Sequence, residues 1–579
     1  MFYDFYYKSV LSKAKLVFTF IKSKKKVLSL RSSFEKMQLK KRIIQLTIFF
    51  LALVGIETVV CAQKMAPIQG VLLLSGSFAE LRPAHFHGGV DYRTGGVTGK
   101  PVSAFDDGYV SRVSVSPTGY GKAIYINHLD GTMSVYAHLD SFDSRIAELV
   151  RHEQYTQKSF KVDFVPSDTI WFKRGQVIAK SGNTGGSAGP HLHFEVREAG
   201  TNTLLNPLNY IKVVDNMAPE IKGVYLYGVN MSGVERCSKR YTVQREGNKY
   251  SAGTLSVESG VFGVGVHVVD RMEGSVGKLG VYRIKLYADG ELVSTYVADS
   301  VAFSQNRLVD LLGDYAAYSR RETVYKTFGK DWSSLLGCSA DFDGYLGVEQ
   351  DSVVALRMEF SDINGNTSVL SFKVKGGKPR AASYSGVVWH SDESNDARIR
   401  ECCLKLDEAS LIRNIVVNPE YFADTVKQRD VYRFVASEEP LLAPARIKMM
   451  GSYDRRAVIC RINTKGGVVP METVWHADSL VSQSTILGKY TIALDTVAPK
   501  VQLRTKSATR VNFIVDDAMT GVQDIQLFVN GEWTLYEFDP KKSSLYVDRK
   551  EPAFKGMNDE IELRVVDAVG NCSQLVITI

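Results

Sequence analysis

Short apolar runs that alternate with polar residues, separated by glycine-containing turns, restrict residues 65–210 to one fold class. Lys122–Asn127 and Thr132–Ala137 are two such runs, and Asp130–Gly131 lies between them. An alternation of period two marks a strand with one buried face, and a tight turn joins antiparallel neighbours. The pattern therefore predicts an antiparallel β domain.

An internal repeat organises the rest of the chain. Asp215–Ile221 (Asp-Asn-Met-Ala-Pro-Glu-Ile) resembles Asp495–Val501 (Asp-Thr-Val-Ala-Pro-Lys-Val). The same correspondence continues downstream, where Val269-Asp270 matches Val515-Asp516, and Asp362-Ile-Asn-Gly-Asn-Thr-Ser368 matches Asp567-Ala-Val-Gly-Asn-Cys-Ser573. Two copies of one β module explain this repetition most simply. Their strand spacing and turn signals resemble those of immunoglobulin-type β-sandwiches.

With 579 residues, the chain has room for about four domains at roughly 150 residues each. The fold class that we predict is mainly β, an antiparallel β domain followed by immunoglobulin-like sandwich modules. The predicted limits are 1–36, an extension that a wrongly chosen start codon would explain; 37–62, a signal peptide; 63–212, the first β domain; 213–376, a sandwich module with an insertion; 377–492, a further β module; and 493–579, the repeated module.

The net charge of +8 is carried by the N-terminus. The first 62 residues contain twelve Lys and Arg against three acidic residues, so the remaining 517 residues have a net charge of −1. A near-neutral working chain does not fit a nucleic-acid binder. A hydrophobic content of 45% with 23% charged residues is ordinary for globular protein and excludes wholesale disorder and a multi-span membrane protein.

The sequence from Met37 has the order of a secretory signal. A Lys-Lys-Arg head is followed by an apolar run from Ile43 to Ile56 and by Val-Cys-Ala up to Ala62. The apolar run is shorter than the roughly 20 residues of a membrane span. We therefore expect export to the periplasm or cell envelope of a bacterium, and an uncleaved signal would leave the protein anchored in the membrane.

Histidine is concentrated in the first β domain, where two spacings matter. His191 and His193 are two residues apart and His87 and Asp91 four, so on a strand each pair lies on one face. Two imidazoles and one carboxylate are a common protein contribution to a catalytic zinc, which keeps a further position open for water. One histidine of the pair 191/193 is then left free to act as a base.

The region resembles the lysostaphin/LytM-type zinc metallopeptidases over about residues 65–210. The motifs occur in that family's order: Phe86-His-Gly-Gly-Val-Asp91, Val102-Ser-Ala, Asp107-Gly108, Gly119-Tyr-Gly121, Tyr136-Ala-His138-Leu139, Gly175-Gln-Val-Ile, Gly182-Asn-Thr-Gly185, Gly189-Pro-His-Leu-His-Phe-Glu195 and Asn206-Pro207.

The resemblance implies a role for each matching residue. His87, Asp91 and His193 match the zinc ligands. His191 matches the base that takes a proton from the water held by the zinc, and His138 matches the second catalytic histidine, which helps to stabilise the oxyanion.

The family's activity implies that 63–212 is the zinc metallopeptidase domain of an endopeptidase. Its substrates would be the peptide crosslinks of bacterial peptidoglycan, with one Zn²⁺ per domain, and no nucleic-acid partner is expected. The alternative from another class is a catalytically silent envelope scaffold that activates a separate cell-wall amidase. The β modules would bind the wall, glycan or a cell-envelope partner protein, or would only space the enzyme.

The chain is longer than the family's core between Leu139 and Gly175. There, apolar residues at helical spacing predict a helix over Asp143–Gln157, and Phe160–Trp171 adds strand-like sequence. This insertion would form a wall of the substrate groove or control access to it. Among the other histidines, we expect His85 and His128 to line or support the groove, and the remaining four to be solvated: His152, His267, His390 and His476.

Overall fold

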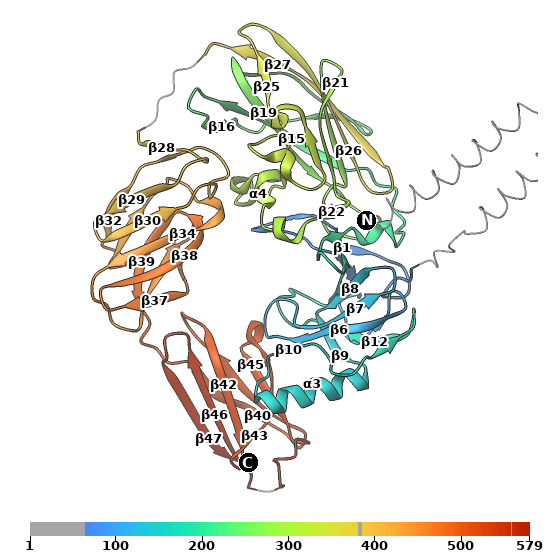
Figure 1. Ribbon diagram of the computed structural model, residues 1–579, viewed down its shortest axis with the longest axis vertical. Coiled ribbons are helices and arrows are strands. Elements are labelled where there is room, and N and C mark those ends of the chain that lie inside the picture. The colour runs from blue at the N-terminus through green and yellow to red at the C-terminus, as the bar shows by residue number, and fades with distance from the viewer. Residues whose placement is uncertain (1–63, 380–384, 557) are drawn as a thin grey trace, which may run out of the picture. The chain divides into compact units, whose positions relative to one another are not determined.

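The computed structural model describes residues 64–379, 385–556 and 558–579 (Figure 1). The predicted extension and signal peptide, residues 1–62, lie outside the described residues. Within the described ranges the chain is mainly antiparallel β, which confirms the predicted fold class. No helix of this part is both long and apolar enough to cross a membrane. The domain limits themselves remain predictions.

One large sheet is the main element of the first domain and carries Asp91, His191 and His193 on its strands. Its main strands are, in spatial order, β1 (Leu74–Gly76), β4 (Val90–Arg93), β13 (His191–Glu198), β8 (Thr132–Ala137), β7 (Lys122–His128), β6 (Gly108–Val115) and β10 (Val162–Phe164). Two short strands extend it, β11 (Trp171–Phe172) on β6 and β14 (Leu204–Leu205) on β13. Beside it lie a sheet of β5 (Pro101–Ser103), β12 (Val177–Ser181) and β9 (Leu139–Phe142), and the pair β2 (Leu81–Arg82) and β3 (His85–Phe86).

Strand β13 shows why this sheet has two different faces. Leu192, Phe194 and Val196 are fully buried and belong to the hydrophobic core. Because successive side chains on a strand point to opposite faces, the odd-numbered positions, from His191 to Arg197, lie on the other face. The central strand thus anchors the core with one face and presents polar side chains with the other.

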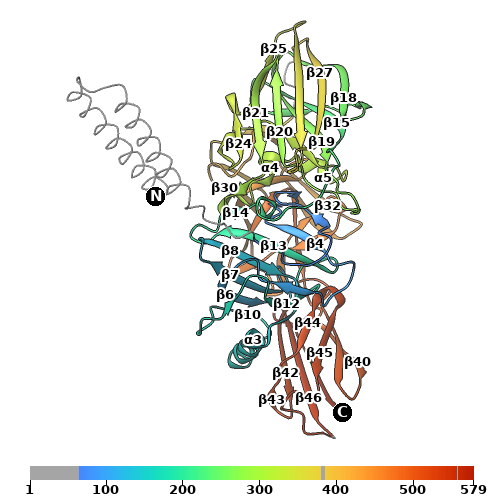
Figure 2. The same ribbon diagram turned by 90° about the vertical axis from the view of Figure 1, so that its right-hand side faces the viewer.

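The predicted helix is present as α3 (Ser144–Gln157), which packs beside β9 and β10 (Figures 1 and 2). The side chain of Asp143 caps it by accepting a hydrogen bond from the backbone of Arg145, and Lys158 ends it in the left-handed conformation. Ile146 and Val150 are buried one turn apart. The strand-like sequence that follows contains β10 and β11.

The segment after the first domain forms two sheets around a common core, with a set of short helical turns between strands. One sheet has β16 (Glu235–Cys237), β15 (Glu220–Val229), β19 (Gly260–Val269), β23 (Val324–Lys326) and β25 (Leu346–Val348). The other has β17 (Gln244–Glu246), β18 (Lys249–Glu258), β27 (Thr367–Gly377), β26 (Val353–Ser361), β20 (Arg283–Ala288), β21 (Glu291–Val297) and β24 (Cys338–Ala340). The pair β18 and β27 is parallel, an exception in this antiparallel chain. A further short strand, β22 (Ser300–Val301), pairs with β14 of the first domain. The helices are α4 (Val309–Leu312) and α5 (Tyr315–Tyr318).

Two more sheet pairs complete the described chain. The third segment has a small strand pair and two five-stranded sheets. The pair is β28 (Val387–Trp389) and β31 (Ile415–Val417), and the first five-stranded sheet is β29 (Asn395–Ile399), β30 (Cys402–Leu406), β34 (Glu439–Met450), β38 (Ser479–Leu487) and β37 (Thr473–His476). The second is β32 (Glu420–Asp424), β33 (Arg429–Arg433), β39 (Lys489–Leu494), β35 (Ala457–Ile462) and β36 (Val468–Pro470). The last has two four-stranded sheets: β40 (Lys500–Lys506), β41 (Arg510–Asp516), β45 (Ser544–Asp548) and β44 (Glu537–Asp539); and β43 (Glu532–Trp533), β42 (Val522–Val529), β46 (Glu560–Asp567) and β47 (Cys572–Thr578).

One prediction about the histidines was wrong. His152 and His476 are exposed and His390 is half-buried, but His267 is only 8% exposed. It lies on β19, a strand that neighbours cover on both faces and that is paired with β15, β23 and β25. His267 alternates with valines along this strand, so its side chain lies on the other face from theirs. The sequence could not show that other segments cover that face as well.

Candidate metal centre

The register of three strands brings the predicted site together. His193 of β13 lies directly opposite Asp91 of β4 on one side and Ala137 of β8 on the other. His138 immediately follows Ala137, so it lies next to His193 although 55 positions separate them in the sequence. The rings of His138 and His191 are 4.8 Å apart, centroid to centroid. Four of the five predicted site residues are therefore neighbours. His87 joins them from the segment between β3 and β4, so it does not lie on one strand with Asp91 as the spacing suggested.

Three of them form a compact triangle of donor atoms. Nε2 of His87 lies 3.0 Å from Oδ1 of Asp91 and 3.0 Å from Nδ1 of His193, and the latter two atoms are 2.8 Å apart. The residues are 2%, 6% and 6% exposed. His87, Asp91 and His193 are thus one of the groups in the described chain that could hold a metal ion.

The outer nitrogens of both imidazoles are occupied by backbone or carboxylate acceptors. Nδ1 of His87 lies 2.7 Å from the carbonyl oxygen of Ser77, and Nε2 of His193 lies 2.9 Å from Oε1 of Glu195. Because a carbonyl and a carboxylate only accept, these nitrogens carry the protons of the neutral rings. The three inner atoms, two imidazole nitrogens and one carboxylate oxygen, are then all acceptors facing one another. With both rings in these neutral forms, a cation at the centre would satisfy all three atoms, and two histidines with one carboxylate suit zinc. Without a cation, a second proton on His193, whose pKa is raised to about 9, takes that place.

Charges around the triangle reinforce this conclusion. Burial alone would raise the pKa of Asp91, but the charge of His87 and the hydrogen bonds of His191 and His193 hold it well below its usual range. Burial alone would lower the pKa of His193, but the carboxylates of Asp91 and Glu195 raise it to about 9. The carboxylates therefore create a field that favours positive charge at this point. Arg82 donates to the remaining oxygen of Asp91 at 2.7 Å and fixes its orientation.

His191 and His138 lie beside the triangle with one ring nitrogen each tied to the backbone. Nδ1 of His191 is 2.8 Å from the carbonyl oxygen of Gly189, and Nδ1 of His138 is 2.9 Å from that of Thr184. Among the described residues Nε2 of His138 has no hydrogen-bond partner, whereas that of His191 lies 3.5 Å from Oδ1 of Asp91. Burial and the neighbouring histidines, His193 and then His191, lower the pKa of His138 to about 3, so this ring is neutral near pH 7.

The backbone of His138 is unusual. Its φ of 57° lies in the left-handed region, which few residues other than glycine adopt. Its backbone nitrogen donates to the carbonyl oxygen of Tyr120 at 2.8 Å, which holds the bend between β8 and β9.

Sequence reasoning did not assign a role to Glu195. Its carboxylate accepts from Tyr120 at 2.6 Å and from Arg197 at 2.7 Å while it contacts His193, and it is 1% exposed. The signal was available, because Glu195 is two residues after His193 on the same strand and so shares its face. Ser77 and Arg82 had no such signal, because they reach the site from other segments of the chain.

Neither His85 nor His128 is a ligand in this arrangement. His85 is exposed on β3. His128 is buried at the end of β7, where its ring contacts the carbonyl oxygen of Asp107 at 3.0 Å and the hydroxyl of Ser134 at 2.7 Å. His128 therefore supports the packing of the sheet.

Fold and site together define a class, that of antiparallel β domains with a set of residues that could hold a metal ion. Within that class, residues 85–160 and 161–207 match the model of peptidase family M23. The predicted family is thereby confirmed for this part of the chain, and these residues form an M23 domain.

Curated relatives match the same region. The "DD-carboxypeptidase/endopeptidase Mpg" of Neisseria meningitidis serogroup B is 32% identical over 127 residues, which are 22% of this chain and 22% of that protein. The "Murein hydrolase activator NlpD" of Escherichia coli (strain K12) is 35% identical over 116 residues, 20% of this chain and 24% of that protein. The chain thus spans only about a fifth to a quarter of the length of these relatives.

Among solved structures, the catalytic domain of the prophage-encoded M23 protein EnpA from Enterococcus faecalis is 26% identical. The match covers 24% of this chain and 94% of that chain, with a TM-score of 0.19.

Proposed function

We propose that this protein is an exported zinc-dependent endopeptidase that hydrolyses peptide bonds in the crosslinks of bacterial peptidoglycan. The observation that carries the proposal is the set of three buried acceptors at His87, Asp91 and His193, with His191 and His138 beside it. A structural metal would not require two additional histidines.

His87, Asp91 and His193 would hold the metal through the three inner atoms. Bound zinc lowers the pKa of a coordinated water from about 16 to about 7, which supplies a nucleophile at neutral pH. Ser77 and Glu195 keep the two imidazoles in the tautomers that leave a lone pair directed inward.

His191 is assigned the role of proton acceptor. Its Nδ1 is held by Gly189, so the lone pair of Nε2 is available 3.5 Å from the Asp91 oxygen that belongs to the triangle. The hydroxyl of Ser187 also lies 3.0 Å from Nδ1 and helps to fix the ring plane. A positioned base of this kind contributes about 10²–10⁴-fold to the rate.

His138 is assigned to the oxyanion. With Nδ1 held by Thr184, the neutral ring has no proton on Nε2 and cannot yet donate. A negative charge that develops on the substrate next to Nε2 would raise the proton affinity of that atom, so that the ring would take a proton from solvent water and donate it in a hydrogen bond to the oxyanion. The ring of His138 would thereby take up a proton as the negative charge develops on the substrate.

The alternative is an activator without catalysis of its own, and the similarity to a murein hydrolase activator favours considering it. All five site positions are filled here, which supports the enzyme. Export is part of the proposal and rests on the basic and apolar order of residues 37–62.

The decisive experiment uses purified protein lacking residues 1–62, loaded with zinc and incubated with crosslinked muropeptides whose products are identified by mass spectrometry. We expect one zinc per chain and cleavage that stops with a chelator and returns with added zinc. Protein that binds zinc but leaves every crosslink intact, while it stimulates an amidase, would establish the activator instead.

A further inference from the structure

Three aspartates converge in the first module, away from the metal centre. Asp215 precedes β15, Asp270 follows β19 and Asp362 follows β26, so the ends of separate strands bring them together. One carboxylate oxygen from each lies within 4.8 Å of the others, and the residues are 8%, 4% and 5% exposed. The adjacent cation, Arg271, points to Glu220 instead, at 3.9 Å. Three carboxyl groups are therefore buried side by side.

Asp270 contributes, with its Oδ1, the one carboxylate oxygen of this cluster that is buried and unpaired among the described residues. Burial and the neighbouring carboxylates of Asp362 and Asp215 raise the pKa of Asp270 to about 8. A buried carboxylate oxygen without a partner is costly, so it requires a proton or a cation.

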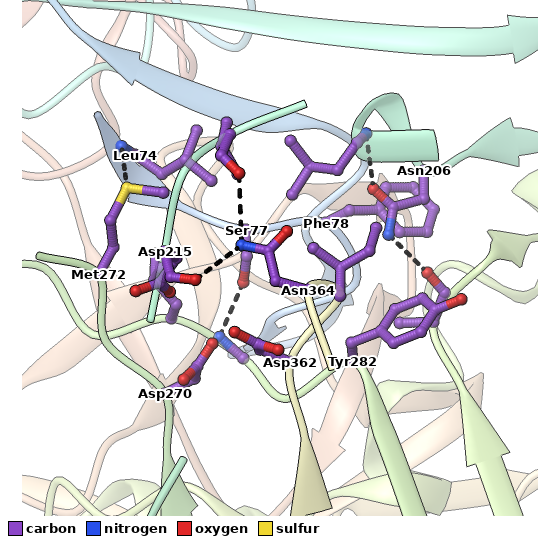
Figure 3. Close-up of a pocket in the computed structure, with 16 residues that line it drawn as sticks. Leu74, Ser77, Phe78, Asn206, Asp215, Asp270, Met272, Tyr282, Asp362 and Asn364 are labelled. Atoms are coloured by element: carbon purple, nitrogen blue, oxygen red, sulfur yellow. Dashed lines mark hydrogen bonds between the residues drawn. The ribbon is translucent and has the colours of Figure 1, made fainter. Parts of the chain in front are cut away.

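The three carboxylates line a cavity of about 30 Å³. Figure 3 shows them gathered toward one side of this cavity, with Ser77 of the first domain close by. A water molecule needs at least about 10–15 Å³ of such space. The cavity therefore has room for one ion and a coordinated water.

The same construction occurs again in the last module, at Asp495, Asp517 and Asp567, where one oxygen from each again lies within 4.8 Å of the others. In each copy one asparagine clamps the first and third aspartates. Its side-chain nitrogen donates to the carbonyl oxygen of the first and to Oδ2 of the third, at 3.0 and 2.7 Å from Asn366 and at 3.0 and 2.7 Å from Asn571.

The sequence repeat misassigned one member of this second cluster. Aligning Val269-Asp270 with Val515-Asp516 pairs Asp270 with Asp516, but Asp516 is exposed and Asp517 joins the cluster. Oδ1 of Asp517 is buried without a partner, as is Oδ1 of Asp270. Both modules thus offer an unpaired carboxylate oxygen at the same place.

We propose that Asp215, Asp270 and Asp362 bind one Ca²⁺, and that Asp495, Asp517 and Asp567 form a second site of the same design. Calcium takes six to eight oxygen ligands in adaptable geometry, which three carboxylates and water can supply. Magnesium demands near-ideal octahedral geometry, and zinc prefers nitrogen and sulfur donors. The proposal is independent of the peptidase function.

Calcium at the first site would stabilise the junction with the metallopeptidase domain. The hydroxyl of Ser77 accepts from the backbone of Gly280 at 2.8 Å, and the carbonyl of the same serine holds His87 at 2.7 Å. A cation that orders this cavity would therefore also order the segment that orients a zinc ligand.

The test is calcium binding by the purified protein at constant zinc, in buffer freed of calcium, followed by isothermal titration calorimetry and thermal unfolding. We expect two Ca²⁺ per chain and, at about a 100-fold excess over Kd, a rise in Tm of about 5 °C. Magnesium at the same concentration should give a smaller rise. Wild-type protein that binds no Ca²⁺ would overturn the proposal.

A pair of variants distinguishes a bound cation from a proton that the carboxyl groups share. Asp270→Asn should lose one equivalent of Ca²⁺, and Asp516→Asn, an exposed aspartate beside the second cluster, should bind both equivalents. If Asp270→Asn were more stable than the wild type at pH 7 and neither protein bound Ca²⁺, the cluster would hold protons rather than a cation.

Discussion

Nε2 of His193 lies 2.9 Å from Oε1 of Glu195, a residue two positions further along the same strand. This contact fixes the tautomer in which Nδ1 of His193 faces Asp91 and His87. Tyr120 and Arg197 in turn hold the carboxylate, so the orientation of a proposed zinc ligand depends on a buried network of four residues.

Removing the charge of Glu195 should weaken metal binding. We expect Glu195→Gln to reduce zinc affinity by about 10–100-fold, because the partner of a metal-bound imidazole raises its basicity and orients it. The measurement is competition with a chromophoric chelator. Glu198→Gln, an exposed residue at the end of the same strand, is the matched control and should bind zinc as tightly as the wild type. Equal affinity of all three proteins would show that Glu195 does not tune the site.

Substitution of His193 and substitution of His191 should have different effects on zinc binding and activity. His193→Ala should lose zinc and activity together, because it removes one corner of the triangle. His191→Ala should retain zinc but lose about 10²–10⁴-fold in turnover, because it removes only the base. Metal analysis and muropeptide cleavage measure the two effects, with His152→Ala on the exposed face of α3 as control. Retained activity in both variants would refute these assignments.

A buried ion pair in the first module should matter strongly for stability. Nζ of Lys326 lies 2.9 Å from Oε2 of Glu235, with side chains 2% and 4% exposed. Glu235→Gln leaves the ammonium buried without its charge partner, so we expect a loss of about 3–5 kcal/mol in the free energy of unfolding. Urea denaturation measures it. Glu258→Gln, which removes the exposed pair with Arg236, should cost less than about 1 kcal/mol.

Stability should also fall as the pH rises through neutrality. Burial is the main cause that raises the pKa of Asp310 to about 7, and nearby Asp314 adds to it while Arg413 opposes it. A carboxyl with a raised folded-state pKa contributes fully below its unfolded value of about 4 and loses that contribution as pH rises through about 7.

The expected loss from Asp310 approaches about 4 kcal/mol well above pH 7. Asp310→Asn should remove this part of the pH dependence in denaturation measured from pH 4 to pH 8. Asp341→Asn, an exposed aspartate of the same module, should leave the wild-type profile unchanged. If the wild type and Asp310→Asn had parallel profiles, Asp310 would not be the titrating group.

The sequence by itself determined whatever depends on local periodicity. Alternation predicted the strands at 122–127 and 132–137, helical spacing predicted α3, and the ordered motifs identified the M23 domain and its five candidate site residues. These features depend only on neighbours along the chain, where strand and helix geometry fix which side chains share a face.

Only the tertiary structure decided what surrounds those residues. Ser77 and Glu195 orient the two imidazoles, Asp517 rather than Asp516 joins the second aspartate cluster, and His267 is buried rather than solvated. Each of these outcomes depends on strand register, on loop conformation or on the layer that covers a sheet, which arise when distant segments pack. Spacing along the chain determines the face on which a side chain lies, but the packing of distant segments determines which residue it contacts.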